Sequence, residues 1–167
     1  MALSSKRRSA GRSFWATRPF EWAVVAAVVA IALVSVNRQY RDLEGQAEYA
    51  AIQSVLGSMR TALVLDFLQR RLAGEPSHAG PLKNPVLLLQ PLPTYAGDLG
   101  MARQSEARPG NWLFDAECVC VGYRPLNPEW LEPAQDFPAI WFQLRDNRGA
   151  PELTPMRAYR WHGAPIN

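Results

Sequence analysis

The chain has 167 residues, a length that suits one folded domain with an extension rather than two full-sized domains. Its 48% apolar and 20% charged residues exclude a disordered chain, and its near-neutral mean hydropathy excludes a polytopic membrane protein. Two cysteines and two histidines exclude a disulfide-dense scaffold and a four-cysteine zinc site. We therefore expect a protein that is not an enzyme, with no metal, no cofactor and no small-molecule substrate.

The net charge of +3 has a local origin. Residues 1–19 contain no acid and five cations, which are Lys6, Arg7, Arg8, Arg12 and Arg18. A nucleic-acid-binding protein would need basic groups spread over a folded face. We therefore expect no nucleic-acid partner, and we interpret residues 1–19 as a basic cytoplasmic leader.

Residues 20–37 are predicted to form a transmembrane helix. The run from Phe20 to Val36 is about 17 residues, the low end of what a membrane span needs, and it is rich in Ala and Val and uncharged from residue 22 onward. Trp15 and Trp22 flank it as expected membrane-interface anchors. A cleaved secretory signal and the core helix of a soluble protein are the alternatives. No turn follows the run, and the basic flank favours the membrane anchor.

The charge pattern also predicts the orientation in the bilayer. Five cations precede the span, whereas Arg38 and Arg41 are balanced by acids that follow it. The positive-inside rule places the N-terminus in the cytoplasm and residues 38–167 outside it as one domain. Glu21 stands at the head of the span, either as an interfacial acid or as a charge directed at a partner.

Residues 38–73 are predicted to continue the same helix, because this stretch has no proline and Gly74 offers a C-terminal stop. One apolar stripe follows helical spacing and comprises Ile52, Val55, Leu56, Met59, Ala62 and Leu63. We expect most of the charged residues, Glu44, Glu48 and Arg60 among them, to fall off this stripe. A coiled-coil stalk is one interpretation, but the spacing near 3.6 favours packing on a sheet.

The rest of the chain is predicted to be a loop followed by a sheet. Prolines and glycines punctuate residues 74–110. Within residues 111–167 we expect short strands at 112–114, 118–123, 140–145 and 153–161, the last interrupted at Pro155. Strands that cover the helical stripe give one α+β fold, in which a long N-terminal helix packs on a small antiparallel sheet.

Few side chains suggest chemistry. Cys118 and Cys120, two apart on one predicted strand, are either small core residues or a disulfide, and a metal site would need further ligands. Asp115 and Glu117 are expected to be turn residues rather than paired catalytic carboxylates. Among the tryptophans, Trp112 and Trp141 are expected in the core, and Trp130 and Trp161 are left open.

Short motifs extend the pattern. They are Asn84-Pro85-Val86, the run from Pro91 to Gly97, Pro109-Gly-Asn-Trp-Leu-Phe-Asp115, and Gly122-Tyr123-Arg124. With a basic leader, a glutamate at the head of a span, a long helix and a sheet, the chain resembles the minor type IV pilins and the type II secretion pseudopilins. The resemblance covers about residues 20–161 and implies a pilin-like α+β fold.

The resemblance implies a site and a setting. With Glu21 as the fifth mature residue, a prepilin peptidase would cut between Ala16 and Thr17, with Ala in place of the usual Gly. Arg18 and Pro19 depart from the family pattern. Glu21 would set helix register against a neighbour's amino terminus. The implied partners are the lipid bilayer and other pilin, pseudopilin or envelope secretion proteins, in a bacterial inner membrane with a periplasmic domain. The alternative is an uncleaved single-pass scaffold whose distal domain binds an envelope protein.

Overall fold

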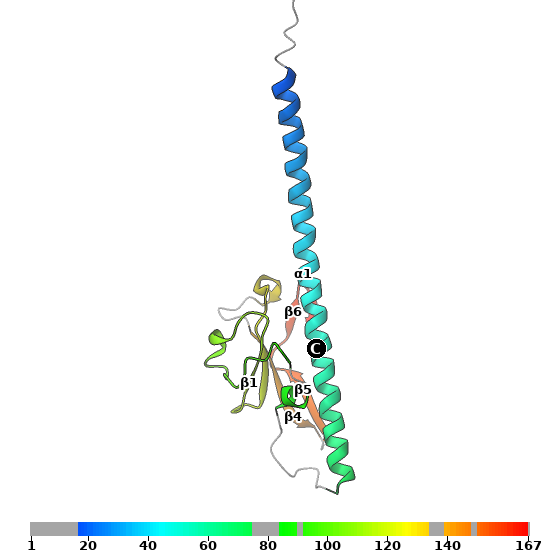
Figure 1. The fold of residues 1–167 in the computed structure, drawn as a ribbon. Helices are drawn as coiled ribbons and strands as arrows, with labels where there is room; N and C mark the ends of the chain where they lie inside the picture. Colours follow the sequence, from blue (N-terminus) through cyan, green and yellow to red (C-terminus); the bar gives the residue numbers. More distant parts are fainter. Residues whose placement is uncertain (1–16, 75–83, 90–91, 134–138, 148–149, 167) are drawn as a thin grey trace, which may run out of the picture. The chain divides into compact units, whose positions relative to one another are not determined.

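The computed structural model describes residues 17–74, 84–89, 92–133, 139–147 and 150–166 (Figure 1). The chain divides into two compact units, one up to Leu43 and one from Glu44 onward. A single helix, α1 (Thr17–Leu72), contributes to both and is 56 residues long. It ends where Gly74 takes φ 78° and donates its N–H to the carbonyl of Arg71 at 3.1 Å. This is a common helix terminus, because glycine adopts positive φ without steric cost.

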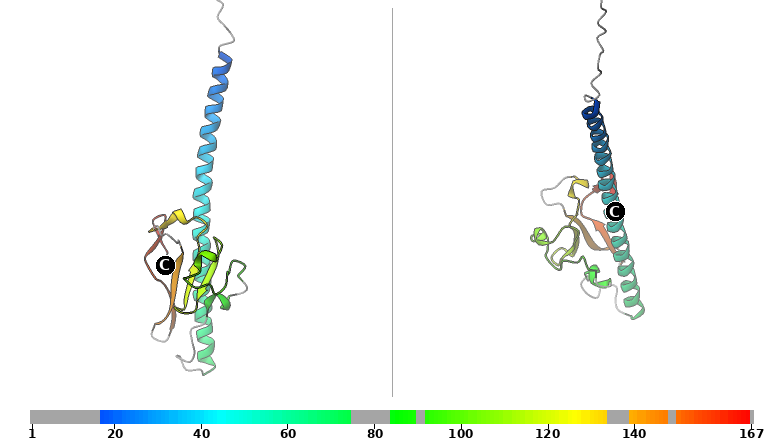
Figure 2. Two further views of the ribbon diagram at one scale, coloured as in Figure 1. Left: turned by 90° about the vertical axis from the view of Figure 1, so that its left-hand side faces the viewer. Right: turned by 45° about the horizontal axis from the view of Figure 1, so that its top comes forward.

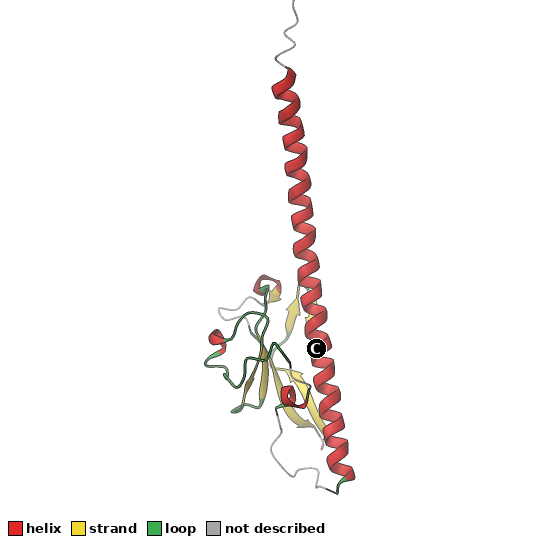
Figure 3. Cartoon of the chain, viewed as in Figure 1, coloured by secondary structure: helices red, strands yellow, loops and turns green. Residues whose placement is uncertain are grey.

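The second unit is built on a four-stranded antiparallel sheet in the order β1-β2-β4-β5. Its strands are β1 (Trp112–Asp115), β2 (Cys120–Tyr123), β4 (Ile140–Asn147) and β5 (Ala150–Pro155). Figure 3 shows this sheet beside the distal part of α1. The long helix and antiparallel sheet confirm the predicted α+β fold.

Both faces of this sheet are covered. On β1, Trp112 and Phe114 belong to the main core with Ile52, Leu56 and Met59 of α1, whereas Leu113 points to the other side. There it joins a second cluster with Ala107, Cys120, Ala139 and Trp141, against which Leu99 and Met101 pack. Two covered faces explain why every residue of β1 and β2 is buried.

A second, three-stranded sheet lies in the order β3-β6-β7. It consists of β3 (Leu131–Glu132), β6 (Tyr159–Trp161) and β7 (Ala164–Ile166). The predicted strand over 153–161 is thus two strands in different sheets, and β3 and β7 were not predicted. Figure 2 gives two further views of these strands beside the distal part of α1. The described residues of this unit also form three short 3₁₀ helices, η1 (Pro85–Leu88), η2 (Gln104–Glu106) and η3 (Pro128–Trp130).

Burial on α1 follows the predicted stripe in part, since Val55 and Ala62 are only half-buried. Ile52, Leu56, Met59 and Leu63 are buried, as predicted. Glu48, which was expected off the stripe, is only 5% exposed and continues the stripe toward the N-terminus. The expectation was wrong because the sheet region presents polar groups, not apolar ones, to this turn of the helix.

Gly45 lies on the same buried face, under the ring of Trp130. A Cβ at position 45 would lie 2.7 Å from that ring, and the Gly45 carbonyl accepts the indole N–H of Trp161 at 2.8 Å. We expect Gly45→Ala to lower the free energy of unfolding by about 1–2 kcal/mol, because the clash outweighs the better helix propensity of alanine.

Gly57 provides the matched control, since it is exposed on the same helix with nothing within 4 Å of its added Cβ. Gly57→Ala should raise the free energy of unfolding by about 0.5–1 kcal/mol. Denaturant unfolding of the full-length protein in detergent micelles, followed by tryptophan fluorescence, measures both. Equal effects of the two substitutions would contradict the packing of Trp130 on Gly45.

Candidate assembly interface

Between residues 20 and 36, the N-terminal part of α1 exposes an apolar surface in which Glu21 is the one charged residue. Every described side chain from Phe20 to Val36 is exposed, with Phe20 at 71% and Trp22 at 74%. The hydroxyl of Ser35 donates to the carbonyl of Ile31 at 2.9 Å, so this polar group is satisfied within the helix. Among the described residues, α1 is the one helix long and apolar enough to cross a membrane.

The predicted site residues of this region fall on both sides of the described boundary. Trp15 and Ala16 lie outside the described residues, and Thr17 is the first residue of α1. Glu21 and Trp22 are exposed on the helix just past its first turn. A carboxylate here lies close to the positive end of the helix dipole.

The distal part of α1 carries a second exposed surface, on the side opposite the core. At about 100° per residue, the direction opposite Ile52, Leu56 and Leu63 has no charged residue between positions 46 and 72. We call this surface the neutral face, and all its residues are exposed. It comprises Ala47, Ala50, Ser54, Gly57, Ser58, Thr61, Val64, Leu65, Leu68 and Leu72.

Charged side chains of this part of α1 lie toward the sheet or beside it. Asp66 and Arg70 form an ion pair one turn apart, and the Arg60 guanidinium donates to the carbonyl of Leu153 at 3.3 Å. Arg71 stacks on Phe67, with 5.1 Å from its guanidinium carbon to the ring centroid. A solvated helix normally carries its charges on the face away from the core, so this arrangement is reversed.

Two hydroxyl groups of the neutral face donate their hydrogen bonds within the helix itself. Ser58 donates to the carbonyl of Ser54 at 2.9 Å, and Thr61 donates to the carbonyl of Gly57 at 2.9 Å. Each hydroxyl therefore needs no external acceptor. Small residues fill the middle of the face and larger apolar ones its C-terminal end, where Leu65 is 53% and Leu72 is 88% exposed. Such a surface permits close approach of another helix.

Glu48 anchors the sheet region to the other side of α1. One carboxylate oxygen accepts the Tyr123 hydroxyl at 3.0 Å and the Leu126 N–H at 2.6 Å. The second oxygen accepts the Asn127 N–H at 3.1 Å and its side-chain amide at 2.9 Å. Four donors satisfy a buried carboxylate in place of a cation. Burial, followed by the nearby negative charge of Glu48, raises the pKa of Tyr123 above its usual range, so its phenol remains a donor.

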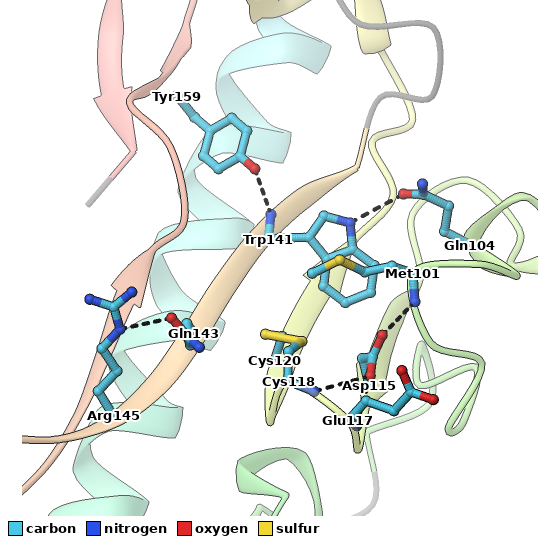
Figure 4. Close-up of a disulfide and its surroundings, with 10 residues drawn as sticks. All are labelled: Met101, Gln104, Asp115, Glu117, Cys118, Cys120, Trp141, Gln143, Arg145 and Tyr159. Carbon is cyan, nitrogen blue, oxygen red and sulfur yellow. Dashed lines mark hydrogen bonds between the residues drawn. A yellow bond between two sulfur atoms is a disulfide. The ribbon is translucent and has the colours of Figure 1, made fainter.

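The turn between β1 and β2 holds the two cysteines. Cys118 lies in the turn, and Cys120 is the first residue of β2, so the prediction that both lie on one strand was wrong. A disulfide joins them, with Cα atoms 5.2 Å apart (Figure 4). Glu117 lies in this turn, as predicted, whereas Asp115 is the last residue of β1. The Asp115 carboxylate accepts the backbone N–H of Glu117 at 2.9 Å and of Met101 at 2.7 Å.

The tryptophans of the sheet region lie in the core or pack against it. Trp112 and Trp141 are buried, as predicted, and so is Trp161. Trp130 is half-buried, with its ring centroid 4.5 Å from that of His162. Within the described parts of the chain, no three His, Cys, Asp or Glu side chains are grouped to hold a metal ion.

Comparison of the chain with protein-family models, with curated proteins and with solved structures finds no match. The neutral face, the Glu48 contacts and the exposed apolar segment are therefore interpreted from their own geometry. Sequence reasoning missed the first two. The face could have been found by plotting charges around the helix, whereas the partners of Glu48 depend on tertiary structure.

Proposed function

We propose that this protein is a pilin-like or pseudopilin-like subunit, or an assembly accessory, of a type IV pilus or type II secretion system. Residues 20–37 would anchor it in a bacterial inner membrane, with the N-terminus in the cytoplasm and the domain from residue 38 in the periplasm. Its partners would be the bilayer and the helices of other subunits.

The neutral face is the observation that carries this proposal. A helix that packs only on its own sheet gains nothing by placing its charges beside that sheet and leaving the opposite side uncharged. A helix that must also pack against neighbouring helices needs that opposite side free of charge, because an unpaired carboxylate or guanidinium buried there would cost several kcal/mol. Ala50, Ser54 and Ser58, one turn apart, supply the small side chains that close helix contact requires.

The exposed apolar segment supports the same proposal. It belongs to the same uninterrupted helix, and its Ala and Val residues offer small side chains to lipid or to other helices. Glu21 is the one acid between residues 19 and 36. In a bundle of such helices, pairing of Glu21 with a neighbour's amino terminus would set the axial register.

An uncleaved membrane scaffold is the second candidate. Arg18 and Pro19 favour it, because they would be the second and third residues after the cut at Ala16–Thr17 and depart from the family pattern. In this function the distal sheets would bind an envelope partner, and Glu21 would be an interfacial acid without a specific role.

Glu21→Gln separates the two candidates, since it removes the charge and keeps the shape. In cells that make the protein naturally, we expect the variant to reach the membrane at normal levels. Its recovery in the sheared filament fraction should fall at least about tenfold, because the buried charge pair is lost. Glu44→Gln, an exposed acid beyond the apolar segment, is the control and should behave as wild type. Unchanged recovery of Glu21→Gln would favour the scaffold.

A further inference from the structure

The disulfide between Cys118 and Cys120 spans a very short piece of chain. It closes a loop of three residues, with a sequence separation of 2. A disulfide stabilises a fold mainly by restricting the unfolded chain, and this effect shrinks as the closed loop becomes shorter. A disulfide of this kind contributes little to the stability of the fold.

The turn that carries the disulfide is held by other contacts. Asp115 pairs with Cys120 in the register of β1 and β2, and its carboxylate accepts the backbone N–H groups of Glu117 and Cys118. The Val119 carbonyl accepts the N–H of Leu144 at 3.0 Å. The main core on the helix side contains neither cysteine. The architecture therefore does not depend on the sulfur–sulfur bond.

The residue between the two cysteines has an unfavourable backbone conformation. Val119 has φ 54°, a region that β-branched residues rarely adopt. The hydrogen bonds of Asp115 and of the Val119 carbonyl hold the turn around it. The turn therefore keeps its shape when the sulfur–sulfur bond opens.

Access to the two sulfur atoms is unequal. Cys120 is fully buried at 0% exposure beside Leu113 and Trp141, whereas Cys118 is half-buried in the turn after the exposed residues Ala116 and Glu117. Figure 4 shows the disulfide at the turn, with Asp115 and Trp141 beside it. Cys118 packs against the edge of the second core cluster but is the more exposed of the two cysteines, so an incoming thiol reaches it more readily than Cys120.

We propose that Cys118–Cys120 is a reversible thiol–disulfide exchange site that is entered through the Cys118 sulfur. Its reaction partner is a dithiol. One thiolate of the dithiol attacks Sγ of Cys118 and bonds to it, the Cys118–Cys120 bond breaks, and Cys120 leaves as a thiolate that takes up a proton. The second thiol of the dithiol then loses its proton and attacks the dithiol sulfur that is bonded to Cys118. This step releases Cys118 as a thiolate, which is then protonated. Two electrons pass from the dithiol, now a disulfide, to the two cysteines, and a disulfide oxidant reverses the reaction.

Single-cysteine variants of the full-length protein in detergent micelles test the entry point. Cys120→Ser leaves Cys118, and Cys118→Ser leaves Cys120. With glutathione disulfide as the probe, Cys120→Ser should form the mixed disulfide at least about tenfold faster than Cys118→Ser, because the buried sulfur reacts only after local opening. Equal rates, or a faster Cys118→Ser variant, would overturn the proposal.

Reduction of the wild-type protein provides a second readout that needs no variant. Dithiothreitol should reduce the bond without denaturant, Cys118 should then be alkylated well before Cys120, and the melting temperature should fall by less than about 8 °C. The tryptophan fluorescence of the folded state should persist, and glutathione disulfide should restore the bond. Resistance to dithiothreitol in the folded state, or cooperative unfolding on reduction, would show that the disulfide serves to stabilise the fold instead. Both readouts are independent of filament assembly.

Discussion

Glu48→Gln is expected to lower the free energy of unfolding by about 2–4 kcal/mol, although it changes a single oxygen to an amide nitrogen. Both oxygens of Glu48 accept two hydrogen bonds, from Tyr123, Leu126 and Asn127. The glutamine NH₂ group would face two donors whichever way it turned. The Tyr123 hydroxyl and the Asn127 side-chain amide could turn to accept from this NH₂ group, but a backbone N–H, of Leu126 or of Asn127, would lose its acceptor. The remaining hydrogen bonds would also lose their charged acceptor.

Two further variants show that the effect comes from these contacts. Glu48→Leu leaves all four donors unpaired and should be at least as destabilising as Glu48→Gln. Glu44→Gln, one turn earlier and exposed, should change stability by less than about 0.5 kcal/mol. Denaturant unfolding in micelles measures all three. A Glu48→Gln protein as stable as Glu44→Gln would show that the carboxylate is not the buried acceptor described above.

Ala50→Glu is expected to abolish assembly and leave the folded unit intact. Ala50 is exposed on the neutral face, so a glutamate there is solvated in the free protein and should change stability by less than about 0.5 kcal/mol. Packed against a second helix, the carboxylate would be buried without a partner, which costs several kcal/mol for each contact. We expect the amount in the sheared filament fraction to fall at least about tenfold. Leu68→Glu, farther along the same face, should act alike.

Ala158→Glu is the matched control for Ala50→Glu. Ala158 is also exposed, but it lies between β5 and β6, away from α1 in the sequence. The added charge and size are the same, so a general effect of acidity on export or solubility would appear in both variants. Loss of assembly for Ala158→Glu as well, or for neither variant, would contradict a role of the neutral face.

The sequence predicted the elements whose determinants are local. The stripe from Ile52 to Leu63 and the stop at Gly74 depend on helical periodicity and on one residue with φ > 0. The first strand could be predicted from its apolar and aromatic run, and β1 indeed occupies Trp112–Asp115. The division of the 153–161 region could be seen only in part, because Pro155 marks a break but does not say that β6 leaves the first sheet.

The missed features depend on partners distant in the chain. Glu48 has a charged side chain, which the local sequence pattern assigns to solvent. Its role as a buried acceptor depends on the donors Tyr123 and Asn127, more than 70 positions away in the chain. β3 and β7 are two and three residues long, too short for a periodic signal, and are defined by pairing with β6. The cysteine pair was found by spacing, but the turn position of Cys118 depends on the register of β1 and β2.

The measurement that tests the proposed function most directly is the intact mass of the protein extracted from its native membranes, from cells with and without an active prepilin peptidase. We expect a peptidase-dependent loss of residues 1–16, which makes Thr17 the mature amino terminus and Glu21 the fifth residue of the mature chain. A full-length mass in both cells would contradict a processed filament subunit and would favour the permanent membrane scaffold.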